Sequence, residues 1–311
     1  MTLSLRQVRY FIAAADSGQV SQAAVDMNVS QSAVTAAIKG LERTLETRLF
    51  DRHSTGVSLT YEGHQFLQHA RNIVAAVNQA TRAPHGARES PAGPIRVGVT
   101  YTVAGYFLPP HLGRFARAFP AIQVQLHEGP RGEIEAALEA GELDIAVLLV
   151  SNIENRAEIA TETLIRSRRR LWLPIDHALL TAASVSLEDV AQEPYVMLTV
   201  DEASQTALRY WEATRFRPRE IFRTSSVEAV RSMVATGMGV TILSDMVYRP
   251  WSLEGQRIET RGLADPVPSM DVGLAWKRSA TPTAAAQAFY EYFSLTFNGA
   301  GQGLIEPRPA R

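Results

Sequence analysis

Apolar residues in the first sixty positions recur every three or four residues, which is the spacing of one face of a helix. This pattern predicts a first helix over residues 5–15, with a glycine stop at Ser17-Gly18. A second, short helix is expected from Ser21. Ser30 is expected to cap a third helix, because a serine at this position can accept a hydrogen bond from the first turn. Three helices in such quick succession favour a small helical domain.

The pattern changes twice between positions 50 and 94. Residues 50–59 predict a short hairpin, because two β-prone runs flank a Ser-Thr-Gly turn. Residues 61–82 predict one longer helix with an apolar stripe of period near 3.6. The members of this stripe are Phe66, Ala70, Ile73, Val74 and Val77. Residues 83–94 contain three prolines and two glycines and therefore predict a linker.

From Ile95 onward, short β-branched or apolar runs alternate with helical patterns. The expected strands lie at residues 95–99, 122–129, 143–150, 195–200 and 240–244. Alternation of this kind is typical of βαβ units and predicts a largely parallel sheet with helices on both faces. The composition of residues 301–311 predicts a disordered tail.

The composition narrows the class of protein. A chain of 311 residues suggests about two domains, and a hydrophobic content of 46% fits a globular protein. The net charge of −1 excludes a nucleic-acid binder that relies on overall positive charge. Cysteine is absent, which excludes a disulfide framework, a cysteine-ligated metal and a thiol nucleophile. Because the N-terminus shows no signal-peptide pattern and no apolar run approaches the ~20 residues of a membrane span, we expect a cytoplasmic protein without a membrane partner.

A set of residues near the N-terminus matches a known family at the same spacings. These residues are Ala23-Ala24, Val29-Ser30-Gln31, Ile38, Leu41-Glu42, Leu45, Leu49-Phe50, Arg52, Leu59-Thr60 and Gly63. In this stretch the chain resembles the DNA-binding domain of the LysR-type transcriptional regulators. It departs from the family at Ser32, where proline is usual, and at Thr35-Ala36, where a polar and a basic residue are common.

The resemblance implies a fold and a division into domains. It implies a winged helix-turn-helix over residues 1–60, which is all-α apart from a small β-hairpin wing. A linker helix for dimerisation, with a hinge, would occupy residues 61–92. An α/β effector-binding domain that resembles periplasmic binding proteins would follow over residues 93–300. Its two lobes would comprise residues 93–164 with 267–300, and residues 165–266.

The start of the third helix has the residue types that a DNA-reading helix needs. Gln31, Ser32 and Thr35 would lie on its outer face, and the apolar residues would face inward. A glutamine amide can bond adenine, and a threonine methyl group can contact thymine in the major groove. The further DNA-binding candidates are Ser30, Lys39 and Arg43 and, in the wing, Arg52 and His53. Each small polar residue could instead be solvated helix surface.

The charge of this domain predicts that binding to double-stranded DNA needs more than one copy. Residues 1–60 carry six basic and five acidic residues, so their net charge is +1. One copy should therefore bind DNA weakly, because contacts with phosphate dominate affinity. The resemblance implies that the helix at 61–82 pairs with a second copy, and we expect a dimer that assembles further into a tetramer. The alternative is a helix that packs only on its own winged domain.

Hydroxyl-bearing residues follow several predicted strands, and ligands of open α/β sheets bind beyond the carboxyl ends of strands. The resemblance points to three of these corners as an effector site. Its candidate residues are Thr100, Tyr101 and Thr102 at the first corner, Thr199 at the second, which runs on to Asp201, and Ser225 and Ser226 at the third. The strand that ends at residues 150–152 offers a fourth corner. Each serine or threonine could instead be a plain helix cap.

The chemistry of these corners favours an anion, because helix N-termini present free N–H groups. An organic carboxylate is therefore a fitting effector. Asp201 and Glu202 complicate this expectation, since acidic residues there would already complement the N-terminus of their own helix.

The remaining polar features point away from catalysis. Arg168-Arg169-Arg170 is better explained as a solvated strand edge than as an anion site. The seven histidines show no metal-ligand spacing, and no acid-base pair, phosphate loop or cofactor fingerprint is present. We therefore expect no catalytic residues, no metal and no cofactor. Two alternatives for the α/β half are a solute-binding protein and an enzyme with a DNA-binding appendage.

Overall fold

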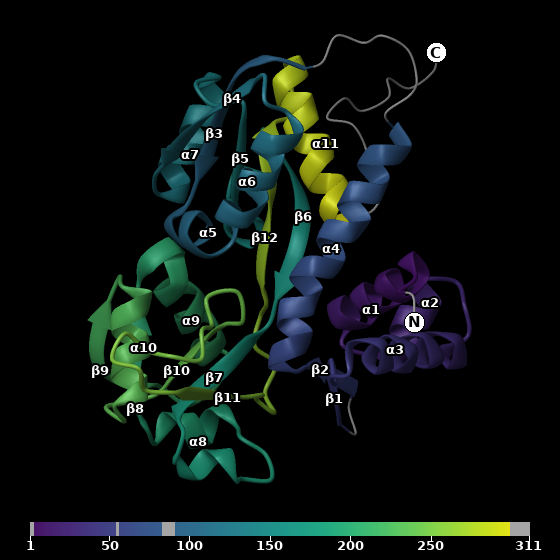
Figure 1. Cartoon of the computed structure of the whole chain (residues 1–311). Helices are drawn as coiled ribbons and strands as arrows, with labels where there is room; N and C mark the ends of the chain where they lie inside the picture. The colour runs from purple at the N-terminus through teal and green to yellow at the C-terminus, as the bar shows by residue number, and fades with distance from the viewer. Residues whose placement is uncertain (1–2, 54–55, 83–90, 299–311) are drawn as a thin grey trace. The chain divides into compact units, whose positions relative to one another are not determined.

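The computed structural model describes residues 3–53, 56–82 and 91–298 (Figure 1). The chain forms two compact units: residues 1–90 with the residues from Gln287 onward, and residues 91–286. The tail expected at 301–311 lies outside the described residues, as do the tip of the hairpin and the proline-rich stretch at 83–90.

The first unit contains the three helices, the hairpin and the long helix expected from the sequence. These elements are α1 (Leu5–Ser17), α2 (Val20–Asp26), α3 (Gln31–Leu45), β1 (Phe50–His53), β2 (Gly56–Leu59) and α4 (Tyr61–Arg82). The glycine stop after α1 is confirmed, since Gly18 has a left-handed φ of 68° and its amide binds the Ala14 carbonyl. The cap of α3 is also confirmed, since the Ser30 hydroxyl accepts a 3.2 Å hydrogen bond from the Ala33 amide.

Aromatic side chains from three elements meet in the core of this unit. The ring of Phe11 in α1 lies 5.1 Å from the ring of Phe50 and 5.1 Å from the ring of Phe66. Ala70 and Val74 of α4 are buried in the same core. The first half of the α4 stripe therefore packs on its own domain, because the three small helices need this cover.

Two residues of the LysR-type motif hold the start of α4 against the hairpin. The Thr60 hydroxyl donates to the Arg48 carbonyl over 2.7 Å and accepts from the Gly63 amide over 2.9 Å. A Cβ atom at Gly63 would lie 2.1 Å from the carbonyl oxygen of Leu49. Only glycine therefore allows this close approach between helix and hairpin.

The first lobe of the second unit is built on a five-stranded sheet of order β4-β3-β5-β12-β6. The strands are β3 (Gly93–Val99), β4 (Ile122–Glu128), β5 (Ile145–Leu149), β6 (Ile159–Ser167) and β12 (Met270–Lys277). Its helices are α5 (Tyr101–Tyr106), α6 (Leu108–Ala118) and α7 (Arg131–Ala140), and η1 (Val150–Asn152) is a short 3-10 turn. The last helix of the chain is α11 (Ala284–Asn298).

The second lobe contains a three-stranded sheet of order β10-β7-β11 and a strand pair, β8-β9. The strands are β7 (Arg169–Pro174), β8 (Pro194–Leu198), β9 (Arg219–Thr224), β10 (Thr241–Ser244) and β11 (Ile258–Arg261). The helices are α8 (Leu187–Ala191), α9 (Ala203–Glu212) and α10 (Val227–Ala235), with 3-10 turns η2 (Ala178–Leu180) and η3 (Val200–Glu202). Trp172 and Trp211 are fully buried and fill the two cores of this lobe.

The expectation of a largely parallel sheet is only partly correct. β3 pairs in parallel with β4 and β5, and β8 pairs in parallel with β9. β12 is antiparallel to β5 and β6, and both pairs of β7 are antiparallel. The physical reason is the path of the chain, which passes from β6 directly into β7 and returns through β12. The returning strand runs against its neighbours.

The interpretation of Arg168-Arg169-Arg170 as a solvated strand edge is wrong. β7 is the central strand of its sheet, with partners on both sides. Arg170 forms a 2.7 Å ion pair with Asp245, and Arg169 donates a 2.9 Å hydrogen bond to the Ser269 carbonyl. These two guanidinium groups bind the protein itself at the place where the chain crosses between the lobes.

Within the described part of the chain, no helix combines the length and the apolar character that a membrane span requires. The same residues contain no group of three or more histidine, aspartate or glutamate side chains that could hold a metal ion.

Candidate DNA-binding surface and effector site

Helix α3 separates its apolar and polar residues onto two faces. Val34, Ile38 and Leu41 are buried against the other helices. The opposite face carries a shallow depression of about 500 Å³, whose lining residues are Gln31, Ser32, Thr35, Ala36 and Lys39. The structure therefore brings four of the predicted DNA-binding residues to one surface at the start of this helix.

Ser30 has a structural role at the same surface. Its hydroxyl caps α3, as described above, and lies 3.0 Å from the hydroxyl of Ser32. The cap fixes the first turn of α3, in which Gln31 and Ser32 are exposed. Ser32 replaces the proline that is usual in the family, and its hydroxyl supports the cap from the side.

The hairpin is attached to α3 by one carboxylate. Glu42 accepts hydrogen bonds from the Leu49 amide at 2.9 Å and from the Phe50 amide at 3.3 Å. The hairpin strands then pair in antiparallel fashion, with Arg52 opposite Val57. His53 lies on the exposed surface, where its Nε2 is 2.8 Å from the Ser58 hydroxyl. The wing residues are thus held at a fixed place relative to α3.

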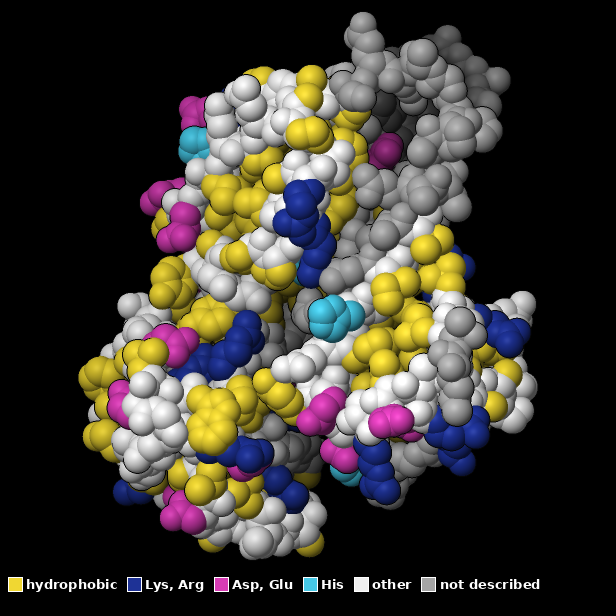
Figure 2. Space-filling model, in the orientation of Figure 1, with side chains coloured by type: hydrophobic (Ala, Val, Ile, Leu, Met, Phe, Trp, Pro, Cys, Tyr) yellow, Lys and Arg dark blue, Asp and Glu magenta, His cyan; other side chains and the backbone are white. Residues whose placement is uncertain are grey.

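Basic side chains lie along the exposed face of α3. Lys39 and Arg43 are both exposed on α3. Figure 2 shows dark blue Lys and Arg side chains along the lower edge of this domain, with acidic side chains between them. This mixed distribution agrees with the small net charge of residues 1–60.

The first effector corner lies at the start of α5 and is well buried. Thr100 occupies the N-cap position with 2% of its surface exposed, and its hydroxyl has no hydrogen-bond partner among the described residues. Thr102 is 3% exposed, and its amide donates a 2.7 Å hydrogen bond to the Asp201 carboxylate. The Thr102 hydroxyl donates to the same carboxylate oxygen, Oδ2. Tyr101, by contrast, is exposed to solvent.

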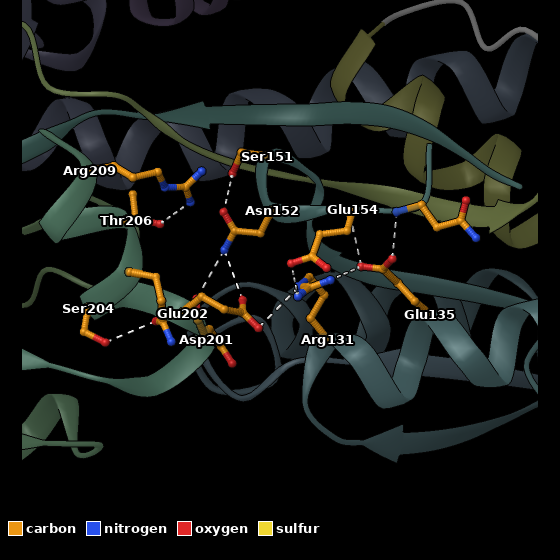
Figure 3. A network of polar contacts seen from close by, with 12 residues as sticks. Arg131, Glu135, Ser151, Asn152, Glu154, Asp201, Glu202, Ser204, Thr206 and Arg209 are labelled. Atoms are coloured by element: carbon orange, nitrogen blue, oxygen red, sulfur yellow. Dashed lines mark hydrogen bonds and ion pairs between the residues drawn. The ribbon is translucent and has the colours of Figure 1, made fainter. Parts of the chain in front are cut away.

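Asp201 belongs to the second corner, in the turn η3 of the other lobe. The next residue, Glu202, accepts a 3.2 Å hydrogen bond from the Asn152 side chain and lies 3.4 Å from the Arg131 guanidinium. Asn152 also donates to the backbone carbonyl of Asp201 over 3.2 Å. Figure 3 shows these groups converging from the two lobes. We call the contacts of Asp201 and Glu202 with Thr102, Asn152 and Arg131 the inter-lobe network.

The expectation that Asp201 and Glu202 complement their own helix is wrong. Glu202 sits at the N-cap position of α9, but its side chain makes no capping hydrogen bond within the part of the chain that is described. Both residues adopt left-handed backbone conformations, with φ of 50° and 55°. These conformations turn the carboxylates away from α9 and towards the first lobe.

The third corner has mainly structural roles. Ser226 caps α10 by accepting a 3.1 Å hydrogen bond from the Ala229 amide. The Thr224 carbonyl of this corner accepts a 2.9 Å hydrogen bond from the amide of Thr199 in the second corner, and Ser225 is exposed. The alternative of a plain cap is thus correct for Ser226.

Six residues of the inter-lobe contacts were not among the predicted site residues: Tyr106, Arg131, Asn152, Asp201, Glu202 and Glu228. Glu228 accepts a 2.6 Å hydrogen bond from the Tyr106 hydroxyl. Asn152 lies in the fourth corner considered from the sequence, and Asp201 lies in the second. Arg131 and Glu228 carried no comparable signal, since a charged residue in the first turn of a helix is common.

Comparison with known proteins agrees with this architecture. Residues 5–64 match the family model of the bacterial regulatory helix-turn-helix protein, lysR family, and residues 88–296 match the LysR substrate binding domain. The HTH-type transcriptional regulator YwqM of Bacillus subtilis, which is uncharacterised, is 31% identical over 95% of this chain and 100% of its own length.

Solved structures show the same relationship. HinK, a LysR family transcriptional regulator from Pseudomonas aeruginosa, is 26% identical with a TM-score of 0.60 and covers 96% of this chain and 98% of its own. Full-length CbnR, solved in complex with its target DNA, shares the fold at 20% identity, with a TM-score of 0.54 and coverage of 94% and 99%. The chain belongs to the LysR family of transcriptional regulators, with a DNA-binding helix-turn-helix domain and an effector-binding domain.

Proposed function

We propose that this regulator reads its operator through the first turns of α3 and senses a small organic carboxylate at the start of α5. The observation that carries the first part is the polar face with exposed Gln31, Ser32 and Lys39 and half-buried Thr35, opposite the buried apolar face of the same helix. Such a helix can enter a major groove of ~12 Å with its small polar side chains against the base edges.

Backbone contacts with DNA would come from the basic residues and the wing. Lys39 and Arg43 lie further along α3, and the hairpin with Arg52 and His53 is anchored to it through Glu42. Because the domain has a net charge of only +1, we propose that two or more copies bind one operator together. Helix α4 would join two copies through the part of its stripe that its own domain leaves half-buried, at Ile73 and Val77.

The observation that carries the effector site is the pair of donors at Thr102. Its amide and hydroxyl both donate to a carboxylate oxygen of Asp201, so this place binds a carboxylate already. The buried Thr100 hydroxyl adds a donor without a partner in the described structure. An effector that carries a carboxylate has the matching chemistry. Oxidation of a thiol cannot be the signal, because the chain contains no cysteine.

Two experiments test these proposals. Selection of bound sequences from a random DNA pool, followed by anisotropy titrations, should yield a preferred site that is bound far more tightly than random DNA. A thermal-shift screen of small carboxylates and their amides on the full chain should identify stabilising carboxylates. Their effect should be lost when Thr100 and Thr102 are both replaced by valine, which keeps their shape. An effector whose affinity survives that double substitution would place the site elsewhere.

A further inference from the structure

The carboxylate of Asp201 occupies the donors that the proposed function assigns to the effector. Thr102 is the second residue of α5, so its amide has no acceptor inside the helix. Asp201 supplies that acceptor at 2.7 Å and takes the Thr102 hydroxyl as well. Chemically, the Asp201 side chain presents to the first lobe what a small carboxylate ligand would present.

Asp201 comes from the opposite lobe, and its neighbour is held there too. Asn152 donates to the Asp201 carbonyl and to the Glu202 carboxylate, and Arg131 lies against Glu202. Through these contacts Asp201 links the two lobes, covalently to η3 on one side and by hydrogen bonds to Thr102 on the other. We call this link the tie; a free ligand has no such covalent connection to η3.

The backbone of this tie is in an unfavourable conformation. Asp201 has φ 50° and ψ 44°, and Glu202 has φ 55° and ψ 25°. Residues with a Cβ seldom adopt left-handed geometry, and two in succession are rarer. The conformation therefore depends on the contacts that the two carboxylates make with the first lobe.

A second observation shows that Asp201 does not satisfy this corner completely. The Thr100 hydroxyl is at the same helix start, 2% exposed, and without a partner among the residues that the structure describes. Buried hydroxyl groups are nearly always hydrogen-bonded. A ligand carboxylate, which is not tethered to the η3 backbone, could serve Thr100 as well as Thr102.

We infer that Asp201 is an internal competitor of the effector: its carboxylate ties the lobes together in the free protein, and the effector carboxylate replaces it and releases η3. This inference rests on the proposed effector site and adds its regulation.

The first test uses acetate, the smallest probe with the Asp201 side-chain chemistry, on the full-length protein. In Asp201→Ala the competitor is gone, so the Kd for acetate should fall about tenfold or more, which corresponds to a donor pair free in about a tenth of wild-type molecules. Acetamide, which lacks the charge, should show no such gain. Asp176→Asn is the matched control, because this exposed carboxylate of the same lobe lies outside the inter-lobe network.

The second test follows hydrogen exchange of the peptides that contain residues 101–106 and 200–206. Without a ligand, the backbone amides of both peptides should exchange faster in Asp201→Ala than in wild type, because the hydrogen bonds between Thr102 and the Asp201 carboxylate are lost. Saturating acetate should restore protection at 101–106 in this variant. In wild type, acetate should leave 101–106 protected and should deprotect 200–206. Protection of both peptides by acetate in wild type would show a ligand that binds with the tie closed and would overturn the inference.

The outcomes separate the inference from the proposed function. If acetate binds wild type and Asp201→Ala equally, and Thr100→Val with Thr102→Val abolishes both, the site is correct and Asp201 is no competitor. If acetate binding survives the valine pair, the proposed site itself is wrong. Absence of acetate binding to Asp201→Ala contradicts the inference in either case.

Discussion

The hydroxyl group of Tyr106 in α5 donates a 2.6 Å hydrogen bond to the carboxylate of Glu228 in α10, and so joins the two lobes at a second place. Glu228 also accepts from the fully buried Arg231, whose other donors bind the carbonyls of Arg249 and Val247. The guanidinium group of Arg249 lies 5.6 Å from the centre of the Tyr106 ring. The short helix α5 is thus held by the second lobe at both ends, through Thr102 and Tyr106.

Removal of the Tyr106 hydroxyl should weaken this contact without disturbing the ring. We expect Tyr106→Phe to lower the free energy of unfolding by about 1 kcal/mol, because one hydrogen bond to a partly exposed carboxylate is lost. Urea denaturation of the full chain, followed by tryptophan fluorescence, measures this change. Tyr101→Phe is the control, since Tyr101 is exposed on the same helix and should be neutral.

Ionisation of Glu228 should make the free energy of unfolding depend on pH in the acid range. The hydrogen bond from Arg231, with help from Tyr106, holds the pKa of Glu228 below its ordinary value of 4.5. A lowered pKa in the folded state contributes stability above the ordinary value, and this contribution is lost as the pH falls. Glu228→Gln should therefore flatten the fall in stability from pH 5 to pH 3. The exposed Glu212, changed to glutamine, should leave that slope unchanged.

At the alkaline end the sign is opposite. Burial and the adjacent Glu228 carboxylate raise the pKa of Tyr106 to about 12. The Tyr106 contribution is therefore complete below the ordinary value of 10 and is lost as the pH rises towards 12. Ultraviolet titration at 295 nm should show one tyrosine fewer titrating at high pH in Tyr106→Phe. A difference that appears below pH 10 would contradict the assignment.

Base reading by α3 predicts a loss that depends on the DNA sequence. Gln31→Ala or Thr35→Ala should weaken binding to the selected site by ~1–3 kcal/mol and should leave binding to random DNA nearly unchanged. Lys39→Ala should weaken both equally and should reduce the salt dependence by about one ion per copy. Gln123→Ala, an exposed glutamine in the other unit, controls for the amide itself. Equal losses on both DNAs for Gln31→Ala would exclude base reading at that residue.

Pairing of two copies through α4 predicts that a charge on its half-buried stripe lowers the oligomeric mass. Ile73→Asp or Val77→Asp would place an unpaired carboxylate in the contact, which is costly once water is removed. Multi-angle light scattering of the full chain should then show a smaller species, with circular dichroism unchanged. Gln65→Asp adds the same charge on the exposed face of α4 and should keep the mass. An unchanged mass for both stripe variants would place the assembly contact elsewhere.

The first unit could be predicted from the sequence because its signals are local. The apolar period gives the helices, and Ser30 and Gly18 mark ends that depend on neighbours within four residues. The inter-lobe network could not be predicted in this way. Asp201 and Thr102 are 99 positions apart, and a left-handed aspartate has no signature in the sequence. The central position of β7 could not be predicted for a related reason. The partners of Arg169 and Arg170 are distant in sequence: Ser269 precedes β12, and Asp245 follows β10.

The close approach of Gly63 to the Leu49 carbonyl couples helix α4 mechanically to the wing. Because a side chain cannot be placed between them, the base of the helix and the wing must rotate together. With 22 residues at 1.5 Å each, α4 is about 33 Å long. A swing of about 10° about the far end of α4 would then shift the wing by about 6 Å, more than the ~3.4 Å between successive base pairs. A small angular change at the far end of this helix therefore moves the wing by more than the spacing of one base pair.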